Sequence, residues 1–138
     1  MPGDAAAHHF SGTIYVNPIE NKSDFYMCLH EVGHIYIQPA WMENPIRLDE
    51  PGGTFLAEAA VVDEYNAEMF ALEHLQLFGL DTDLFEKHAK RYVFKHVRKV
   101  HQKGTKWADL DERLRDIAAN WLGITEANWL AQEWRLVD

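Results

Sequence analysis

The stretch His30-Glu31-Val32-Gly33-His34 decides how this 138-residue chain is interpreted. Residues four apart on an α-helix return to nearly the same face, so both imidazoles can reach one metal ion. Glu31 projects to the side of that face, where it can accept a proton from a water molecule without ligating the metal. Two histidine ligands with a neighbouring general base are the arrangement of zinc-dependent hydrolases. The motif therefore predicts a zinc ion bound by His30 and His34.

Apolar residues on both sides of the motif predict a buried helix over residues 23–37. Its start signal is Ser23-Asp24, and Gln38-Pro39 is expected to end it. The loop that follows, residues 38–53, is rich in Pro and Gly and is long enough to form a wall of a cleft.

A catalytic zinc site needs a third protein ligand, which an acidic helix predicted for residues 54–78 can supply. Glu64 and Glu68 are four residues apart and share one face of this helix. One of them can ligate the metal while the other orients a ligand histidine. Glu58 points away from Glu64, and both Glu58 and Glu73 are expected to be solvent-exposed.

The length and composition predict one globular domain with its own core. The chain has no apolar stretch of membrane-spanning length, and its N-terminus shows no secretory signal. The single cysteine, Cys28, excludes an internal disulfide and is expected to be a buried, inert thiol, with metal ligation as the alternative. We therefore expect a cytoplasmic protein.

The charge distribution is uneven. The net charge of −9 disfavours binding of the whole protein to nucleic acid. A predicted amphipathic helix over residues 82–102 is the exception, because eight basic residues and no acid lie between Lys87 and Lys106. Its outer face is either a solvated surface or a docking patch for an acidic partner. The docking candidates are Lys87, Arg91, Lys95 and Arg98.

The ends of the chain are less informative. Residues 1–11 are expected to be loosely ordered, and residues 13–16 to form a short strand. Two further helices are predicted, over residues 106–121 and 126–135, with the spacing of a helix-turn-helix. The second of these is too acidic for a recognition helix, so we expect the pair to serve packing.

These features together resemble the ImmA/IrrE-like zinc metallopeptidases. The resemblance is close over about residues 12–78 and loose over 114–136. Glu68 departs from it, because the family usually has Asn or Asp there. The matching segments are the strand Thr13-Ile14-Tyr15-Val16-Asn17, the helix of His30-Glu31-Val32-Gly33-His34 and the helix of Glu64-Tyr65-Asn66-Ala67-Glu68-Met69-Phe70-Ala71.

The resemblance implies an α+β fold in a single domain, residues 1–138. This fold has a mainly helical, zincin-like minimal metallopeptidase core with a small β-sheet over residues 1–80 and a helical C-terminal extension over 81–138. It also implies one zinc ion per chain bound by His30, His34 and Glu64, with Glu31 as the general base.

Family members often come from phages, mobile elements or stress-response loci, and some cleave a helix-turn-helix repressor. The expected function is therefore that of a zinc metalloendopeptidase with a regulatory role, acting on a specific intracellular protein.

Two questions stay open at this stage. The donor that stabilises the oxyanion could be His74, Tyr36 or Tyr65, and the sequence does not choose among them. The rival function is a binding protein that keeps zinc as a structural staple and sequesters an acidic partner. A fourth protein ligand such as Cys28 would favour that rival, because structural zinc sites have four protein ligands.

Overall fold

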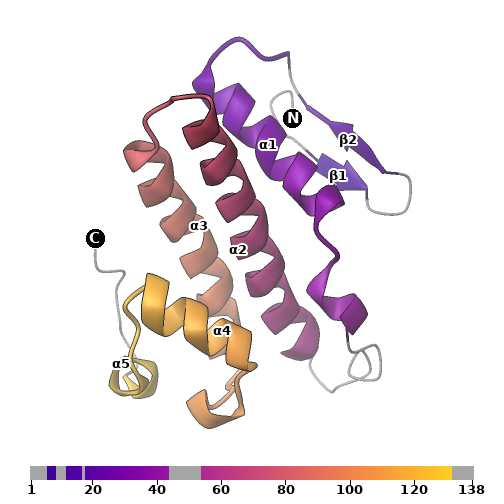
Figure 1. Ribbon diagram of the computed structural model, residues 1–138. Helices are drawn as coiled ribbons and strands as arrows, with labels where there is room; N and C mark the ends of the chain where they lie inside the picture. Colours follow the sequence, from indigo (N-terminus) through magenta and orange to yellow (C-terminus); the bar gives the residue numbers. More distant parts are fainter. Residues whose placement is uncertain (1–5, 9–11, 17, 44–53, 132–138) are drawn as a thin grey trace.

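Three long helices form the body of the protein: α1 (Lys22–Tyr36), α2 (Thr54–Leu77) and α3 (Asp83–Gln102). The computed structural model describes residues 6–8, 12–16, 18–43 and 54–131. Helix α2 lies between α1 and α3 and runs antiparallel to both (Figure 1). The prediction of a mainly helical chain is confirmed. Among the described residues, no helix is both long and apolar enough to cross a membrane.

Helix α1 has clear end signals. The Asn21 side chain accepts a hydrogen bond from the Asp24 N–H at 2.9 Å, so the helix begins slightly before the predicted start. It ends at Tyr36, and the short 3₁₀ segment η1 (Ala40–Glu43) follows. The Ala40 N–H donates to Asp63 of α2 at 2.6 Å. Residues 44–53, the larger part of the predicted cleft wall, lie outside the described residues.

Helices α1 and α2 pack at very close range because Gly33 has no side chain at their contact. A Cβ atom on Gly33 would lie 3.1 Å from the Phe70 Cβ and 3.2 Å from the Ala67 Cα. Such distances are tighter than ordinary van der Waals contact. The glycine inside the motif therefore sets how near the histidines of α1 come to the acids of α2.

Two apolar clusters hold the helices together. One joins α1, α2 and α3, and the other joins α2 and α3 to the C-terminal segments. The buried members of the first are Tyr26, Leu29, Ala71, Leu72, Leu75 and Ala89. Those of the second include Val61, Val62, Val93, Val97, Val100, Leu114, Leu122 and Trp129.

The N-terminal segment differs from the prediction. Residues Ala6–His8 form the strand β1, which pairs antiparallel with β2 (Thr13–Tyr15), whereas residues 1–11 were expected to be loosely ordered. The segment is ordered because its backbone pairs with that of β2, although its small side chains offer little to pack. This two-stranded ribbon packs against α1 on the side away from α3 (Figure 1).

The predicted helix over residues 106–121 is wrong, because the chain divides into three short segments. They are the 3₁₀ segment η4 (Trp107–Asp109), the helix α4 (Glu112–Asp116) and the π-helical turn η5 (Ile117–Trp121). The Asp111 side chain accepts from the Arg113 N–H at 2.9 Å and so starts a new helix. In η5, the N–H of Leu122 donates to the carbonyl of Ile117 at 3.1 Å.

Glu58 is a second correction, because it is only 1% exposed although it was expected at the surface. Its Oε2 accepts the Asp111 N–H at 3.3 Å and ties α2 to the start of α4. Glu73 is exposed, as expected. The last helix, α5 (Glu126–Leu130), begins at a Thr125 cap, and residues 132–135 of its predicted range lie outside the described residues.

Candidate metal centre

Three donor atoms from α1 and α2 converge on one point. The Nε2 atoms of His30 and His34, one turn apart on α1, lie 3.0 Å from each other. The Oε2 atom of Glu64 on α2 lies 3.0 Å from the Nε2 of His30 and 3.2 Å from the Nε2 of His34. Side-chain exposure is 4%, 13% and 18% for His30, His34 and Glu64, so the cluster is largely buried but still reached by solvent.

These separations suit a tetrahedral metal ion. Zinc binds imidazole nitrogen and carboxylate oxygen at about 2.0–2.2 Å, so two ligand atoms of a tetrahedral site are about 3.3 Å apart. The three edges of the donor triangle, 3.0, 3.0 and 3.2 Å, are close to that value. The residues present therefore fit a metal ion in size and donor type.

The charges at the site also favour a cation. Burial alone would raise the pKa of Glu64, but hydrogen bonds and charge from His30 and His34 outweigh it and lower the pKa to about 2. Burial alone would lower the pKa of His34, but the hydrogen bond and charge of Glu64, with the charges of Glu31 and Asp63, raise it. Both shifts mean that the site stabilises positive charge among these atoms.

Glu31 completes a group that can hold a metal ion. The ligand atoms of His30, Glu31 and His34 all lie within 4.8 Å of one another, and Glu31 is 7% exposed. Glu31 follows His30 directly, so it leaves α1 about 100° around the axis from it. It therefore borders the donor triangle from the side.

Glu68 lies behind His30, one turn after Glu64 on α2. Its Oε1 is 3.2 Å from the Nδ1 of His30, so each ring nitrogen of His30 faces a carboxyl group. Glu68 is 3% exposed, and burial raises its pKa to about 8. A carboxyl group in this position restricts the rotation of the imidazole that it contacts.

Helix α3 contributes two residues that the sequence analysis missed. The Tyr92 ring lies edge-on to His30 with centroids 5.9 Å apart, and its hydroxyl is close enough to Glu64 for the two groups to influence each other electrostatically. The His96 ring lies 5.1 Å from that of Tyr92. Burial, then the charges of Glu64, Glu68 and Glu31, raise the pKa of Tyr92, while burial lowers that of His96. Their spacing of four, beside the apolar face of α3, is the sequence signal that could have found them.

The three oxyanion candidates lie elsewhere. His74 is about 15 Å farther along α2 than Glu64, and its Nδ1 is 2.7 Å from the Phe70 carbonyl oxygen. Tyr36 is 78% exposed. The Tyr65 ring packs edge-on against Trp121, with centroids 5.1 Å apart. The structure does not bring these side chains to the donor triangle.

Cys28 is a free, half-buried thiol on α1. It precedes His30 by two residues, about 200° around the helix axis, and so leaves α1 on nearly the opposite side. Among the described residues, the group His30, Glu31 and His34 that could hold a metal ion does not include Cys28.

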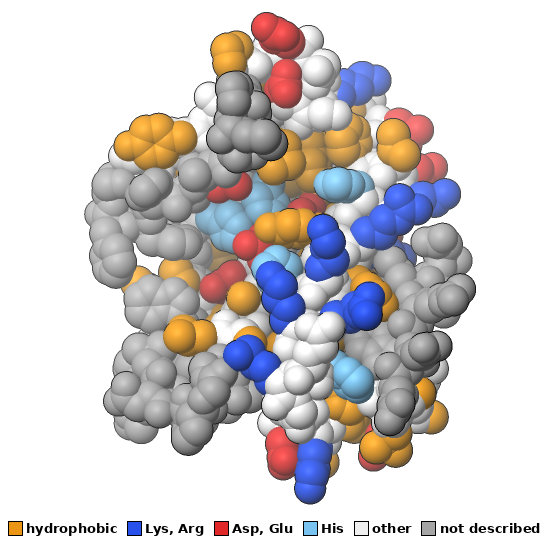
Figure 2. Space-filling model, turned by 180° about the vertical axis from the view of Figure 1, so that it is seen from behind, with side chains coloured by type: hydrophobic (Ala, Val, Ile, Leu, Met, Phe, Trp, Pro, Cys, Tyr) orange, Lys and Arg blue, Asp and Glu red, His pale blue; other side chains and the backbone are white. Residues whose placement is uncertain are grey.

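The docking candidates fall into two pairs on the exposed face of α3. Lys87 and Arg91 line a groove between α3 and α1, whereas the groove does not include the exposed Lys95 and Arg98. Figure 2 shows a row of Lys and Arg side chains beside a hollow where histidine and acidic side chains gather. A row of basic side chains and several histidine side chains therefore lie on the face of the molecule seen in this view.

Comparisons of the chain with protein-family models, with curated proteins and with solved structures find no match. Any function must therefore be inferred from the chemistry and geometry of the residues themselves.

Proposed function

We propose that this protein is a zinc-dependent endopeptidase in which His30, His34 and Glu64 bind the metal and Glu31 is the general base. The observation that carries the proposal is the triangle of two imidazole nitrogens and one carboxylate oxygen with edges of 3.0–3.2 Å. A buried carboxylate beside it, Glu31, is the second element that hydrolysis needs.

Glu64 is the preferred third ligand over Glu31. A ligand must lie about 3.3 Å from the other ligands of a tetrahedral zinc ion, and Glu64 meets this for both histidines. Glu31 leaves the helix at a different angle and remains available for proton transfer. Three protein ligands leave one coordination position open, as in catalytic zinc sites.

The division of labour follows from this assignment. A zinc ion at this position supplies a Lewis acid that acidifies water and polarises the scissile carbonyl. Glu31 accepts the proton of the attacking water and delivers it to the leaving amine. Glu68 lies 3.2 Å from the Nδ1 of His30, and Tyr92 packs beside His30, so both limit the movement of that ligand.

The resemblance to the ImmA/IrrE-like metallopeptidases belongs to the same proposal. The order of the elements supports it, because the ribbon, the motif helix and the third-ligand helix follow one another as the resemblance implies. In this reading the helical arrangement is a minimal zincin-like core, and α3 covers one side of the site. The biological substrate is then a specific protein, while unstructured peptides serve as substrates in the assay.

Metal analysis and a base-deleted variant test the proposal together. We expect about one zinc per purified chain, and loss of zinc from the double variant His30→Ala with His34→Ala. Glu31→Gln should keep its zinc and its circular dichroism spectrum. Its hydrolysis of a casein-derived peptide mixture should fall by about 10²–10⁴-fold, because the proton acceptor is gone.

Glu73→Gln is the matched control, because it makes the same chemical change at an exposed position of α2. It should keep both zinc and activity. If the double histidine variant keeps its zinc, His30 and His34 are not the zinc ligands and the proposed site is wrong. A zinc-loaded wild-type protein that cleaves nothing in the mixture, and is as inactive as Glu31→Gln, would favour the rival binding function.

A further inference from the structure

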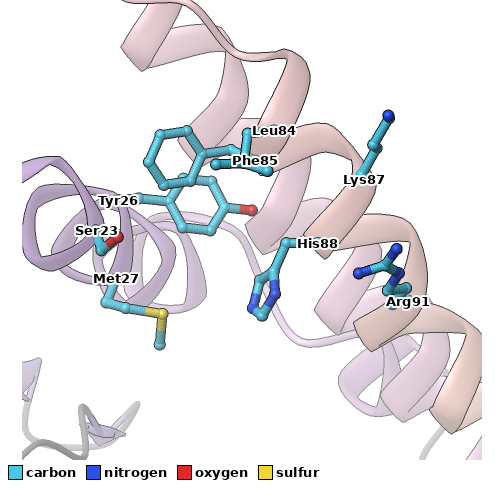
Figure 3. A pocket seen from close by; sticks show the side chains of 8 residues that line it. All are labelled: Ser23, Tyr26, Met27, Leu84, Phe85, Lys87, His88 and Arg91. Carbon is cyan, nitrogen blue, oxygen red and sulfur yellow. The ribbon is translucent and has the colours of Figure 1, made fainter.

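A groove of about 600 Å³ lies between the N-terminal halves of α1 and α3. Volumes of about 300–1,000 Å³ are usual for sites that bind small molecules or short peptide segments. Figure 3 shows Ser23, Tyr26 and Met27 on the α1 side, facing residues of α3. The α3 residues of the lining are Leu84, Phe85, Lys87, His88 and Arg91.

The groove has an apolar floor and a cationic rim. Tyr26 and Phe85 stack across it with ring centroids 4.9 Å apart, and Met27 and Leu84 extend the apolar surface. Lys87 and Arg91 are both exposed on its α3 side. Within the described part of the chain, neither of these two cations is paired with an acid. The lining therefore suits an apolar group that carries a carboxylate next to it.

The Tyr26 hydroxyl gives a second, independent indication of a ligand. Tyr26 is 2% exposed, and its hydroxyl oxygen has no hydrogen-bond partner among the described residues. Buried hydroxyls are nearly always hydrogen-bonded, so an unpaired one calls for an explanation. Figure 3 shows the hydroxyl pointing from α1 toward the His88 side of the groove. An acceptor group entering between Tyr26 and His88 would supply the missing partner.

The groove is next to the metal centre. Tyr26 precedes His30 by one turn on α1, and His88 precedes Tyr92 by one turn on α3, which is about 6 Å along each helix. The ring pairs Tyr26/Phe85 and His30/Tyr92 both bridge α1 and α3. Because an extended peptide advances about 3.3–3.6 Å per residue, the groove can hold a side chain about two residues from the scissile bond.

We infer that this groove is the specificity subsite for a peptide substrate with an aromatic or long aliphatic residue beside one or two acidic residues. Tyr26, Phe85 and Met27 would take the apolar side chain, and Lys87 and Arg91 its acidic neighbours. The net charge of −9 repels acidic peptides from most of the surface, so this rim guides them to one place. The inference rests on the proposed peptidase function for its meaning, but the binding itself does not depend on hydrolysis.

The test measures binding in the full-length, zinc-loaded Glu31→Gln protein, so that cleavage plays no part. The probes are fluorescein-labelled octapeptides that carry Phe followed by two Glu, with matched copies in which both Glu are Gln or the Phe is Ala. Fluorescence anisotropy should show that the Phe-Glu-Glu peptide binds about 3- to 10-fold more tightly than either copy. The preference over the Gln copy should shrink as salt is raised.

Two variants with the same loss of charge separate docking in the groove from a general electrostatic effect. Lys87→Gln with Arg91→Gln should abolish the preference for Glu over Gln. Lys95→Gln with Arg98→Gln removes two charges from the same helix outside the groove and should retain it. Equal loss in both variants, or no preference in the parent protein, would overturn the subsite. Cleavage by wild-type protein without this preference would overturn the subsite and leave the peptidase function standing.

Discussion

Replacing Glu64 and Glu68 separately by glutamine distinguishes the metal ligand from the residue behind it. Both side chains lie on one face of α2, and each faces a different nitrogen of His30. Glutamine keeps the shape of the side chain and removes its charge. The two variants therefore make the same substitution on the two sides of His30, where Glu64 is ionised near neutral pH and Glu68 is largely protonated.

The structure gives the size of the expected difference. The lowering of the Glu64 pKa from 4.5 to about 2, against the opposing effect of burial, corresponds to a net of about 3 kcal/mol from the hydrogen bonds and charges of His30 and His34. Zinc carries more charge than a proton, so Glu64→Gln should weaken zinc binding by at least about 100-fold. Glu68 has a pKa raised to about 8, and glutamine resembles its neutral form. Glu68→Gln should therefore cost no more than about 10-fold, the lower end for residues that support a ligand.

The assay is a competition titration against a fluorescent zinc chelator near neutral pH, with circular dichroism as the check on folding. The reasoning predicts that Glu64→Gln loses far more affinity than Glu68→Gln. If Glu68→Gln weakens zinc binding as much as Glu64→Gln or more, the ligand is Glu68, and the assignment of Glu64 as the zinc ligand from α2 is refuted.

The remaining predictions concern packing, pH and metal removal. Gly33→Ala should lower the free energy of unfolding by about 1 kcal/mol, because overpacking that costs about 1–3 kcal/mol exceeds the gain of about 1 kcal/mol in helix propensity. Urea unfolding in the presence of a chelator measures this loss of stability. An unchanged urea midpoint would contradict the prediction. Zinc affinity should fall between about pH 8 and about pH 6, because the pKa of His34 is raised above 6.5 without metal and its proton competes with zinc at the lower pH; a chelator competition that is flat over this range would count against His34. Zinc at about 100 times its dissociation constant should stabilise the fold by about 2.7 kcal/mol, seen as a rise in melting temperature that a chelator reverses.

Local spacing accounts for what the sequence could predict. The long helices follow from apolar periodicity and end signals, and the structure reproduces them within one or two residues. Helical geometry alone places His30 and His34 on one face, and likewise Glu64 and Glu68. Gly33 could be noticed as part of the motif, but its role became clear only once Phe70 was seen against it.

Contacts between distant segments account for what the sequence could not predict. The spacing of Tyr92 and His96 places the two side chains on one face of α3, but only the packing of α3 on α2 brings Tyr92 beside Glu64. Glu58 was assigned to the surface on its charge, yet a backbone N–H from Asp111 meets it in the core. The position and burial of such residues are determined by tertiary packing, which overrides the average behaviour of a residue type.

The π-helical turn η5 has a consequence for how this chain tolerates change in length. A π turn contains one residue more than an α-helical turn and rotates everything after it by about 100°. Here that extra residue directs the Trp121 ring to within 5.1 Å of Tyr65 and 5.8 Å of the Lys90 ammonium. Deleting the exposed Asn120 would restore an ordinary α-helical register and turn the indole away from both. The extra residue thus shifts the helical register. The fold retains this shift because it places the Trp121 side chain at the junction of α2, α3 and the C-terminal segments.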